Sequence, residues 1–174
     1  MGRIMRAVTA GGFVLAAASG APVSALPVVP DFDSYPRVSA DDYTVRPGLA
    51  YSVRGFRTPS GVYCTSSTHR AMYAMNCVGP LVGAPEGANA VTLYQSGTAV
   101  DPVKFSRVDG PQSDGVPKFE GQPIKLLPKD TAYAFDDATC VWTEGIMLAC
   151  RMGSGEQFNG FVATENATST FGDA

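Results

Sequence analysis

The chain has 174 residues, of which 45% are hydrophobic, and a formal net charge of −3 at pH 7. This mildly acidic balance argues against a nucleic acid or an anionic membrane surface as partner, because both require a basic face. The length suffices for one domain of ordinary size, which can bury roughly 70% of its unfolded surface.

Residues 1–25 have the features of a complete secretory signal. Arg3 and Arg6 precede the apolar run Ala7–Ala18, and the small residues of Val23-Ser24-Ala25 suit a signal peptidase. The run has roughly 12 residues whereas a membrane span needs about 20, so cleavage after Ala25 is favoured over an uncleaved anchor. Cleavage removes two positive charges and moves the formal net charge from −3 to −5. No transmembrane segment is expected in the mature chain.

Residues 26–48 are expected to form an extended N-terminal arm. Each proline in it removes a hydrogen-bond donor and biases the preceding residue toward extended geometry. The prolines of the arm are Pro27, Pro30, Pro36 and Pro47. Such an arm either joins the body through Phe32, Tyr35 or Tyr43, or remains mobile.

Residues 49–174 are expected to form a single domain of short β-strands. Alternation over Tyr51–Phe56 suits a half-buried strand, Thr58–Gly61 suits a type I turn, and Val62–Cys64 begins a second strand. The segment Ala71–Cys77 could be a strand or a helical turn, and its length favours a strand.

The second half of this domain repeats the pattern of short strands and turns. Residues 109–123 are rich in Gly and Pro and are expected to form a long surface loop. Turns are expected at Ser96-Gly97, Glu144-Gly145 and Gly153-Ser154-Gly155. Strands are expected at Ala90–Tyr94 and from Ala99-Val100 to Phe105–Val108, and then in a four-stranded meander at Thr131–Phe135, Cys140–Thr143, Ile146–Met152 and Phe158–Thr164.

No amphipathic helical run is present in the mature sequence, which indicates a mainly β fold. We expect a small antiparallel sandwich or a partly open barrel, with two disulfides.

Four cysteines lie in the mature chain: Cys64, Cys77, Cys140 and Cys150. An even number in an exported chain indicates disulfides, although the spacing permits three pairings. Each neighbouring pair brackets two short apolar runs around a turn, so we expect Cys64–Cys77 and Cys140–Cys150. No metal is expected, because zinc sites use closely spaced ligand couples and His69 is the only histidine.

His69 lies next to Ser66, Ser67 and Thr68, an arrangement that invites comparison with a serine nucleophile and its base. Nucleophilic catalysis requires a hydroxyl beside a base that a third group orients. Residues so close along an extended strand point in different directions, so we interpret His69 as part of a polar loop. No catalytic residue is assigned.

Two acidic pairs and several aromatic residues can each be interpreted either as a functional site or as ordinary structural residues. Asp41-Asp42 and Asp136-Asp137 are interpreted as solvated turn residues, because adjacent strand residues face opposite ways and cannot address one substrate together. A set of aromatic residues is assigned mainly to the core, with a sugar-binding platform as the alternative. These residues are Tyr51, Phe56, Tyr63, Tyr73 and Tyr94.

Several short motifs follow one another between residues 50 and 165. They are Phe56–Cys64, Cys77, Gly83–Val91, Leu127-Pro128, Cys140-Val141, Gly145–Cys150 and Asn159-Gly160-Phe161-Val162. Together they resemble a group of small exported actinobacterial proteins of the mycobacterial type, which have no established activity. The resemblance implies export, paired cysteines and a β fold, and it implies no reaction. Such proteins often have a histidine where this chain has Asn159, so an activity that depends on that histidine is not expected here.

The sequence therefore predicts an exported protein of the cell envelope or extracellular space. We expect a monomeric, non-enzymatic binding or interaction domain without a cofactor, whose partner is a protein or an envelope polymer. The alternative is a small secreted hydrolase with a site that the sequence does not reveal.

Overall fold

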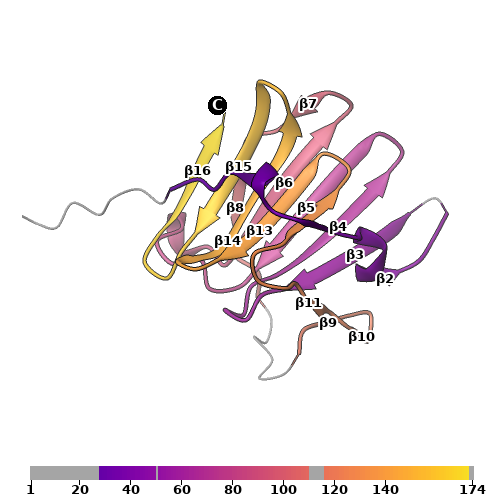
Figure 1. Cartoon of the computed structure of the whole chain (residues 1–174), viewed down its shortest axis with the longest axis horizontal. Helices are drawn as coiled ribbons and strands as arrows, with labels where there is room; N and C mark the ends of the chain where they lie inside the picture. The colour runs from indigo at the N-terminus through magenta and orange to yellow at the C-terminus, as the bar shows by residue number, and fades with distance from the viewer. Residues whose placement is uncertain (1–27, 50, 110–115, 173–174) are drawn as a thin grey trace, which may run out of the picture.

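The computed structural model describes residues 28–49, 51–109 and 116–172. The predicted signal peptide lies outside these residues. Two β-sheets packed face to face dominate the described chain, and its helical residues are confined to short 3-10 turns (Figure 1). The prediction of a mainly β sandwich is confirmed. No helix among the described residues is long and apolar enough to cross a membrane.

Sheet A contains six strands in the order β1-β12-β13-β14-β15-β16. Its central strands are the predicted meander, and Gly145 at the middle hairpin turn, between β13 and β14, has the positive φ of +76° that favours glycine. The last strand pairs with β15 and was not predicted. The strands are β1 (Arg37–Val38), β12 (Ala132–Phe135), β13 (Ala138–Thr143), β14 (Ile146–Ser154), β15 (Gln157–Ala163) and β16 (Thr168–Gly172).

Sheet B contains eight strands, with β11-β3-β4-β5-β6-β7 in order, β2 beside β3 and β8 beside β6. The ambiguous segment at residues 71–77 is therefore a strand. The strands are β2 (Thr44–Arg46), β3 (Ser52–Arg57), β4 (Tyr63–His69), β5 (Met72–Val78), β6 (Ala90–Ser96), β7 (Ala99–Val100), β8 (Lys104–Ser106) and β11 (Lys125–Leu126).

The expected long loop at residues 109–123 contains secondary structure, so that prediction is wrong in its second half. There β9 (Lys118–Phe119) pairs with β10 (Gln122–Pro123) in a small hairpin. Residues 110–115 lie outside the described chain. The hairpin leads into Ile124, which is 1% exposed and packs with Val45 over Gly55 on the outer side of β3. Burial of this apolar side chain holds the segment against the sheet.

The N-terminal arm belongs to both sheets. After the 3-10 turn η1 (Phe32–Ser34), β1 pairs in parallel with β12; after η2 (Ala40–Tyr43), β2 pairs with β3. Phe32 and Tyr43 are each 3% exposed, whereas Tyr35 is half-buried. The arm crosses the outer side of sheet A in Figure 1. There Phe32 covers small apolar side chains that would otherwise face solvent: Ala132, Val141, Ala149 and Val162.

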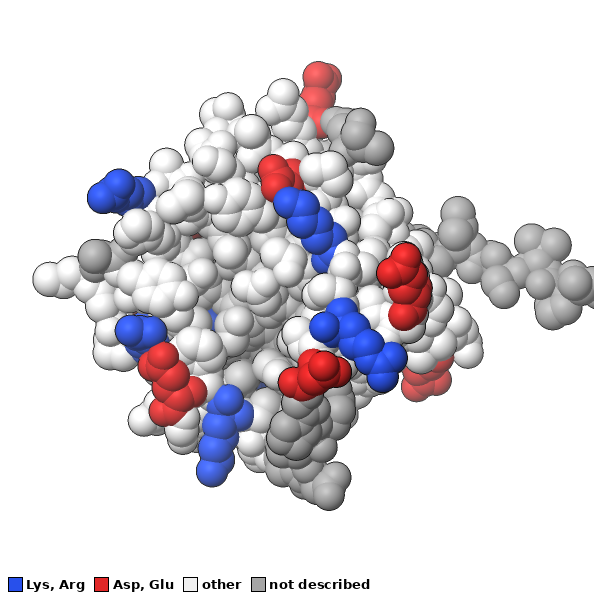
Figure 2. Space-filling view, turned by 180° about the vertical axis from the view of Figure 1, so that it is seen from behind, with Lys and Arg blue, Asp and Glu red and all other residues white. Residues whose placement is uncertain are grey.

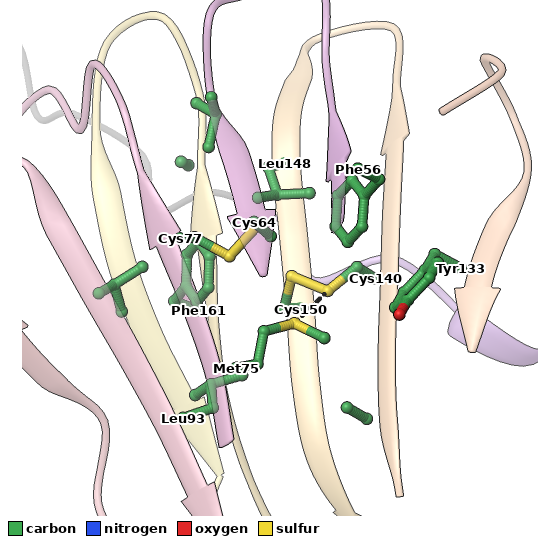
Figure 3. Close-up of a cluster of buried hydrophobic side chains, with 14 of the residues drawn as sticks. Phe56, Cys64, Met75, Cys77, Leu93, Tyr133, Cys140, Leu148, Cys150 and Phe161 are labelled. Atoms are coloured by element: carbon green, nitrogen blue, oxygen red, sulfur yellow. Dashed lines mark hydrogen bonds between the residues drawn. A yellow bond between two sulfur atoms is a disulfide. The ribbon is translucent and has the colours of Figure 1, made fainter. Parts of the chain in front are cut away.

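The core between the sheets is centred on sulfur. Cys64 bonds to Cys77 across β4 and β5, and Cys140 bonds to Cys150 across β13 and β14, which confirms the predicted pairing. The two bridges face each other across the sandwich (Figure 3). Met75 Sδ lies 3.0 Å from Cys140 Sγ, and this is a sulfur–sulfur contact because a disulfide sulfur carries no proton.

The cysteine sulfurs also form the one cluster of potential metal ligands found among the described residues. The Sγ atoms of Cys64, Cys77 and Cys150 lie within 4.8 Å of one another. All three are engaged in disulfide bonds and cannot serve as thiolates. The cluster therefore contributes to the core as apolar, buried sulfur.

Candidate functional site

A cleft of about 620 Å³ opens where the start of β3, the β4–β5 turn and the β12–β13 turn meet. Its volume lies within the range of small-molecule binding sites. It is lined by Gly48, Leu49, Tyr51, Ser52, Arg54, Thr68, His69, Arg70, Phe135 and Asp136.

Arg54 on β3 is the most constrained charge in the cleft. Its Nη2 donates to Asp41 Oδ1 at 2.8 Å and its Nη1 donates to Ser52 Oγ at 3.0 Å. The guanidinium lies over the ring of Phe135 on sheet A, 4.1 Å from the centroid. Its side chain is 16% exposed, and Nε has no hydrogen-bond partner. Stacking and hydrogen bonds together fix this cation in one orientation.

The hydroxyls near His69 serve other partners. Thr68 Oγ1 donates to Asp136 Oδ2 at 2.7 Å, which joins β4 to the turn after β12. Ser66 faces the core, where its Oγ lies 2.6 Å from Tyr133 Oη. His69 itself is an exposed residue at the end of β4 and lines the cleft. The structure therefore does not bring Ser66 and His69 together as a nucleophile and its base.

The acidic pairs occupy exposed positions, as expected, but three of the four carboxylates also form specific contacts. Asp136 accepts from Thr68, and the neighbouring Asp137 accepts from Gln95 Nε2 on β6 at 2.8 Å. Asp41 pairs with Arg54. The turn between β12 and β13 thus connects sheet A to two strands of sheet B.

The five aromatic candidates separate into three environments. Phe56 is 1% exposed and Tyr73 packs against the core cluster. Tyr51 is 40% exposed and lines the cleft. Tyr63 and Tyr94 occupy outward positions of β4 and β6. The assignment of all five to one platform is therefore excluded.

Asn159, which belongs to the last of the motifs named in the sequence analysis, has a structural contact. It is 8% exposed and lies on β15, and its Nδ2 donates to the backbone oxygen of Asp101 at 3.2 Å. This bond links sheet A to the segment between β7 and β8 of sheet B. Asn159 is not among the residues that line the cleft.

Sequence reasoning did not identify the cleft. In the sequence, Arg54 is a polar member of an alternating strand, while Arg70 and Phe135 belong to other hairpins. Alternation predicts the strands but gives no indication that these three residues meet. Comparison of the chain with protein-family models, curated proteins and solved structures finds no match.

Proposed function

We propose that the mature chain is an exported, non-enzymatic binding domain that acts at the cell envelope or outside the cell. We further propose that its cleft takes a small ligand with an anionic group. The observation that carries this proposal is the fixed guanidinium of Arg54 in a cleft that also exposes Arg70. A bound carboxylate or phosphate would replace Asp41 on the guanidinium of Arg54. Ser52 and Phe135 keep that guanidinium oriented, so the exchange needs little reorganisation.

The hydrogen bonds of the cleft favour recognition over hydrolysis. A hydrolytic nucleophile must be activated by a neighbouring base. Here Ser52 Oγ accepts from Arg54, and Thr68 Oγ1 donates to Asp136, so both hydroxyls take part in positioning. The sulfurs are held in disulfides. The contact that the hydrolase alternative could use is the one from Thr68 to Asp136, and no other hydrogen bond among the described residues orients the Asp136 carboxylate as a base.

Export is supported by the same disulfides. Two intramolecular bridges are typical of proteins that fold in oxidising compartments. The signal-like residues 1–25 support the same compartment.

The test is a titration of the isotopically labelled mature protein with small carboxylates and phosphate esters, each compared with its neutral alcohol. We expect anion-dependent NMR shifts at the amides of Tyr51, Thr68 and Phe135. Arg70→Ala should weaken binding about tenfold, the equivalent of one charge-assisted hydrogen bond. Arg107→Ala removes an exposed arginine outside the cleft and should leave the affinity unchanged. Added salt should weaken binding, because the charges are partly solvated.

Two results would contradict the proposal. Equal shifts with anionic and neutral ligands would show that the arginines do not select the ligand. Turnover of the phosphate esters by the wild-type protein, lost in Thr68→Val, would support the hydrolase alternative instead.

A further inference from the structure

The outward side of β4, β5 and β6 carries no charged side chain. Strand alternation places Cys64, Met75 and Leu93 in the core and sends their neighbours outward. Figure 2 shows the molecule from behind, on the sheet B side, where an uncharged area lies between the charged side chains. We call this surface the hydroxyl face and define it by Tyr63, Thr65, Ser67, Asn76, Thr92 and Tyr94.

The hydrogen-bonding groups of the hydroxyl face form an ordered row. Thr65, Asn76 and Thr92 occupy directly opposite positions on the three strands. Neighbouring strands lie about 4.8 Å apart, so the row presents polar groups at a regular spacing. Thr92 Oγ1 donates to Asn76 Oδ1 at 2.9 Å. This bond orients the amide and does not use the two donors of its NH₂ group.

Two tyrosines flank this row diagonally. Tyr63 on β4 shares its row with Ala90 of β6, and Tyr94 lies four residues further along β6. With strands about 4.8 Å apart and a rise of about 3.4 Å per residue, the two Cα atoms are about 17 Å apart. That distance suits an extended oligomer better than a single small molecule.

The face is also rigid. The disulfide Cys64–Cys77 joins β4 and β5 directly beneath it, and β4, β5 and β6 pair in continuous register. On the neighbouring β3, Val45 and Ile124 cover the outer side at Gly55, and Arg57 borders the face opposite Tyr63. A rigid surface loses little conformational entropy when a ligand binds.

We propose that the hydroxyl face binds a neutral carbohydrate polymer. Of the chain's residues, 17% are charged, and none of these lies on the outward side of the three strands. Charged residues stand only at its borders, with Arg57 of β3 opposite Tyr63 and Lys104 of β8 opposite Thr92. Its hydroxyl and amide groups can exchange hydrogen bonds with sugar hydroxyls, and tyrosine rings can pack against the apolar faces of sugar rings. An uncharged polymer requires no counter-charge, which matches the composition of the face. None of the six residues that define the face lines the Arg54 cleft, which begins further along β4 at Thr68 and His69, so this proposal stands independently of the proposed function.

The test is native affinity electrophoresis of the mature protein in gels containing an α-glucan, a β-glucan, a mannan or an arabinogalactan, with hyaluronate as the charged comparison. We expect at least one neutral polymer to retard the protein and hyaluronate to have no effect. Tyr63→Ala/Tyr94→Ala should weaken the retardation at least about tenfold, the scale of a binding hot spot. Ser67→Lys, which places a charge on the face, should have a similar effect.

Two matched variants act as controls. Tyr51→Ala removes a tyrosine from the cleft, and Ser154→Lys adds a charge at an exposed position of sheet A. Both should be retarded as strongly as the wild type. Thermal unfolding midpoints of all variants verify that they are folded.

Several outcomes would overturn the proposal. These are no retardation by any neutral polymer, equal loss in face and control variants, or equal retardation by hyaluronate. Light scattering that shows a wild-type dimer and a monomeric Ser67→Lys variant would instead identify the face as a contact between two copies. Arg70→Ala separates the two sites, because it should weaken anion binding in the cleft and leave carbohydrate retardation intact.

Discussion

Tyr133 is a buried tyrosine whose polar group is satisfied inside the core. Its ring lies 4.7 Å from that of Phe56 and 5.6 Å from that of Tyr43, and its hydroxyl pairs with Ser66 Oγ. Burial of an unpaired hydroxyl would be costly, so this bond links the sheets without a penalty. Burial raises the pKa of Tyr133 far above the usual value, outweighing the Ser66 hydrogen bond and the charge of Arg54, which lower it.

This raised pKa predicts a loss of stability at alkaline pH. Tyrosine in the unfolded chain ionises near pH 10, whereas folded Tyr133 keeps its proton to higher pH. Above about pH 10 the unfolded state therefore binds fewer protons, and the free energy of unfolding falls as pH rises. Burial also raises the pKa of Tyr43, with the charge of Asp42 as a second cause. Tyr43 therefore contributes part of the decrease in unfolding free energy with pH.

The measurement is urea unfolding between about pH 8 and 11. Tyr133→Phe should flatten the alkaline slope. At about pH 8, below the ionisation of tyrosine, it should also lower stability by about 1–3 kcal/mol, because Ser66 loses its partner. The slope is therefore the informative quantity, and an unchanged slope in the variant would refute the assignment.

At the scale of elements, the outer side of sheet A depends on two segments that come from the ends of the described chain. Phe32 of η1 and Phe171 of β16 pack with their ring centroids 6.0 Å apart. Gly160 on β15 lies beneath the Phe171 ring, where a Cβ would collide with it. The guanidinium of Arg151 also contacts η1, with its Cζ 5.1 Å from the centroid of the Phe32 ring and its Nη2 2.8 Å from Asp33 Oδ1. The arm is thus a structural part of the sandwich.

We therefore expect Phe32→Ala to lower the free energy of unfolding by about 3–5 kcal/mol, the usual loss for a large buried aromatic side chain. Val28→Ala in the same arm is the matched control, because Val28 is 81% exposed and should change stability by less than about 0.5 kcal/mol. Urea denaturation of both variants provides the comparison. Equal stability of the two would show that the arm does not contribute to the core.

The elements also show which features were accessible from sequence. The Cys64–Cys77 hairpin and the meander were predictable, because turn residues and alternation are local signals. The pairing of β1 with β12 and of β11 with β3 was not, since the paired residues lie far apart in the chain. The polar strand β16 lacks a clear apolar alternation. The cleft was missed for the same reason as the distant pairings, because Arg54 meets Asp41 and Phe135 only in the folded chain.

At the scale of the whole molecule, redox state and compartment are linked. Both bridges lie at the centre of the sandwich, and all four cysteines are 0–1% exposed. Bridges of this loop length contribute on the order of 2–4 kcal/mol each when they form. They form and persist in oxidising compartments.

We expect the protein recovered from the cell envelope or culture medium to begin at Leu26. Its intact mass should be four hydrogens below that of the reduced chain 26–174, because each bridge removes two. Mass spectrometry with and without reductant tests both points, and peptide mapping should recover the pairs Cys64–Cys77 and Cys140–Cys150. Free thiols or retained residues 1–25 would contradict the proposed export.

Neither disulfide crosses from one sheet to the other. Under mechanical tension the layers can consequently peel apart without breaking a covalent bond. Each bridge would keep its own hairpin closed, so the span of 13 residues from Cys64 to Cys77 and the span of 10 from Cys140 to Cys150 would not add to the length of the stretched chain. A tethered molecule pulled open in this way would retain two preformed hairpins from which to reclose.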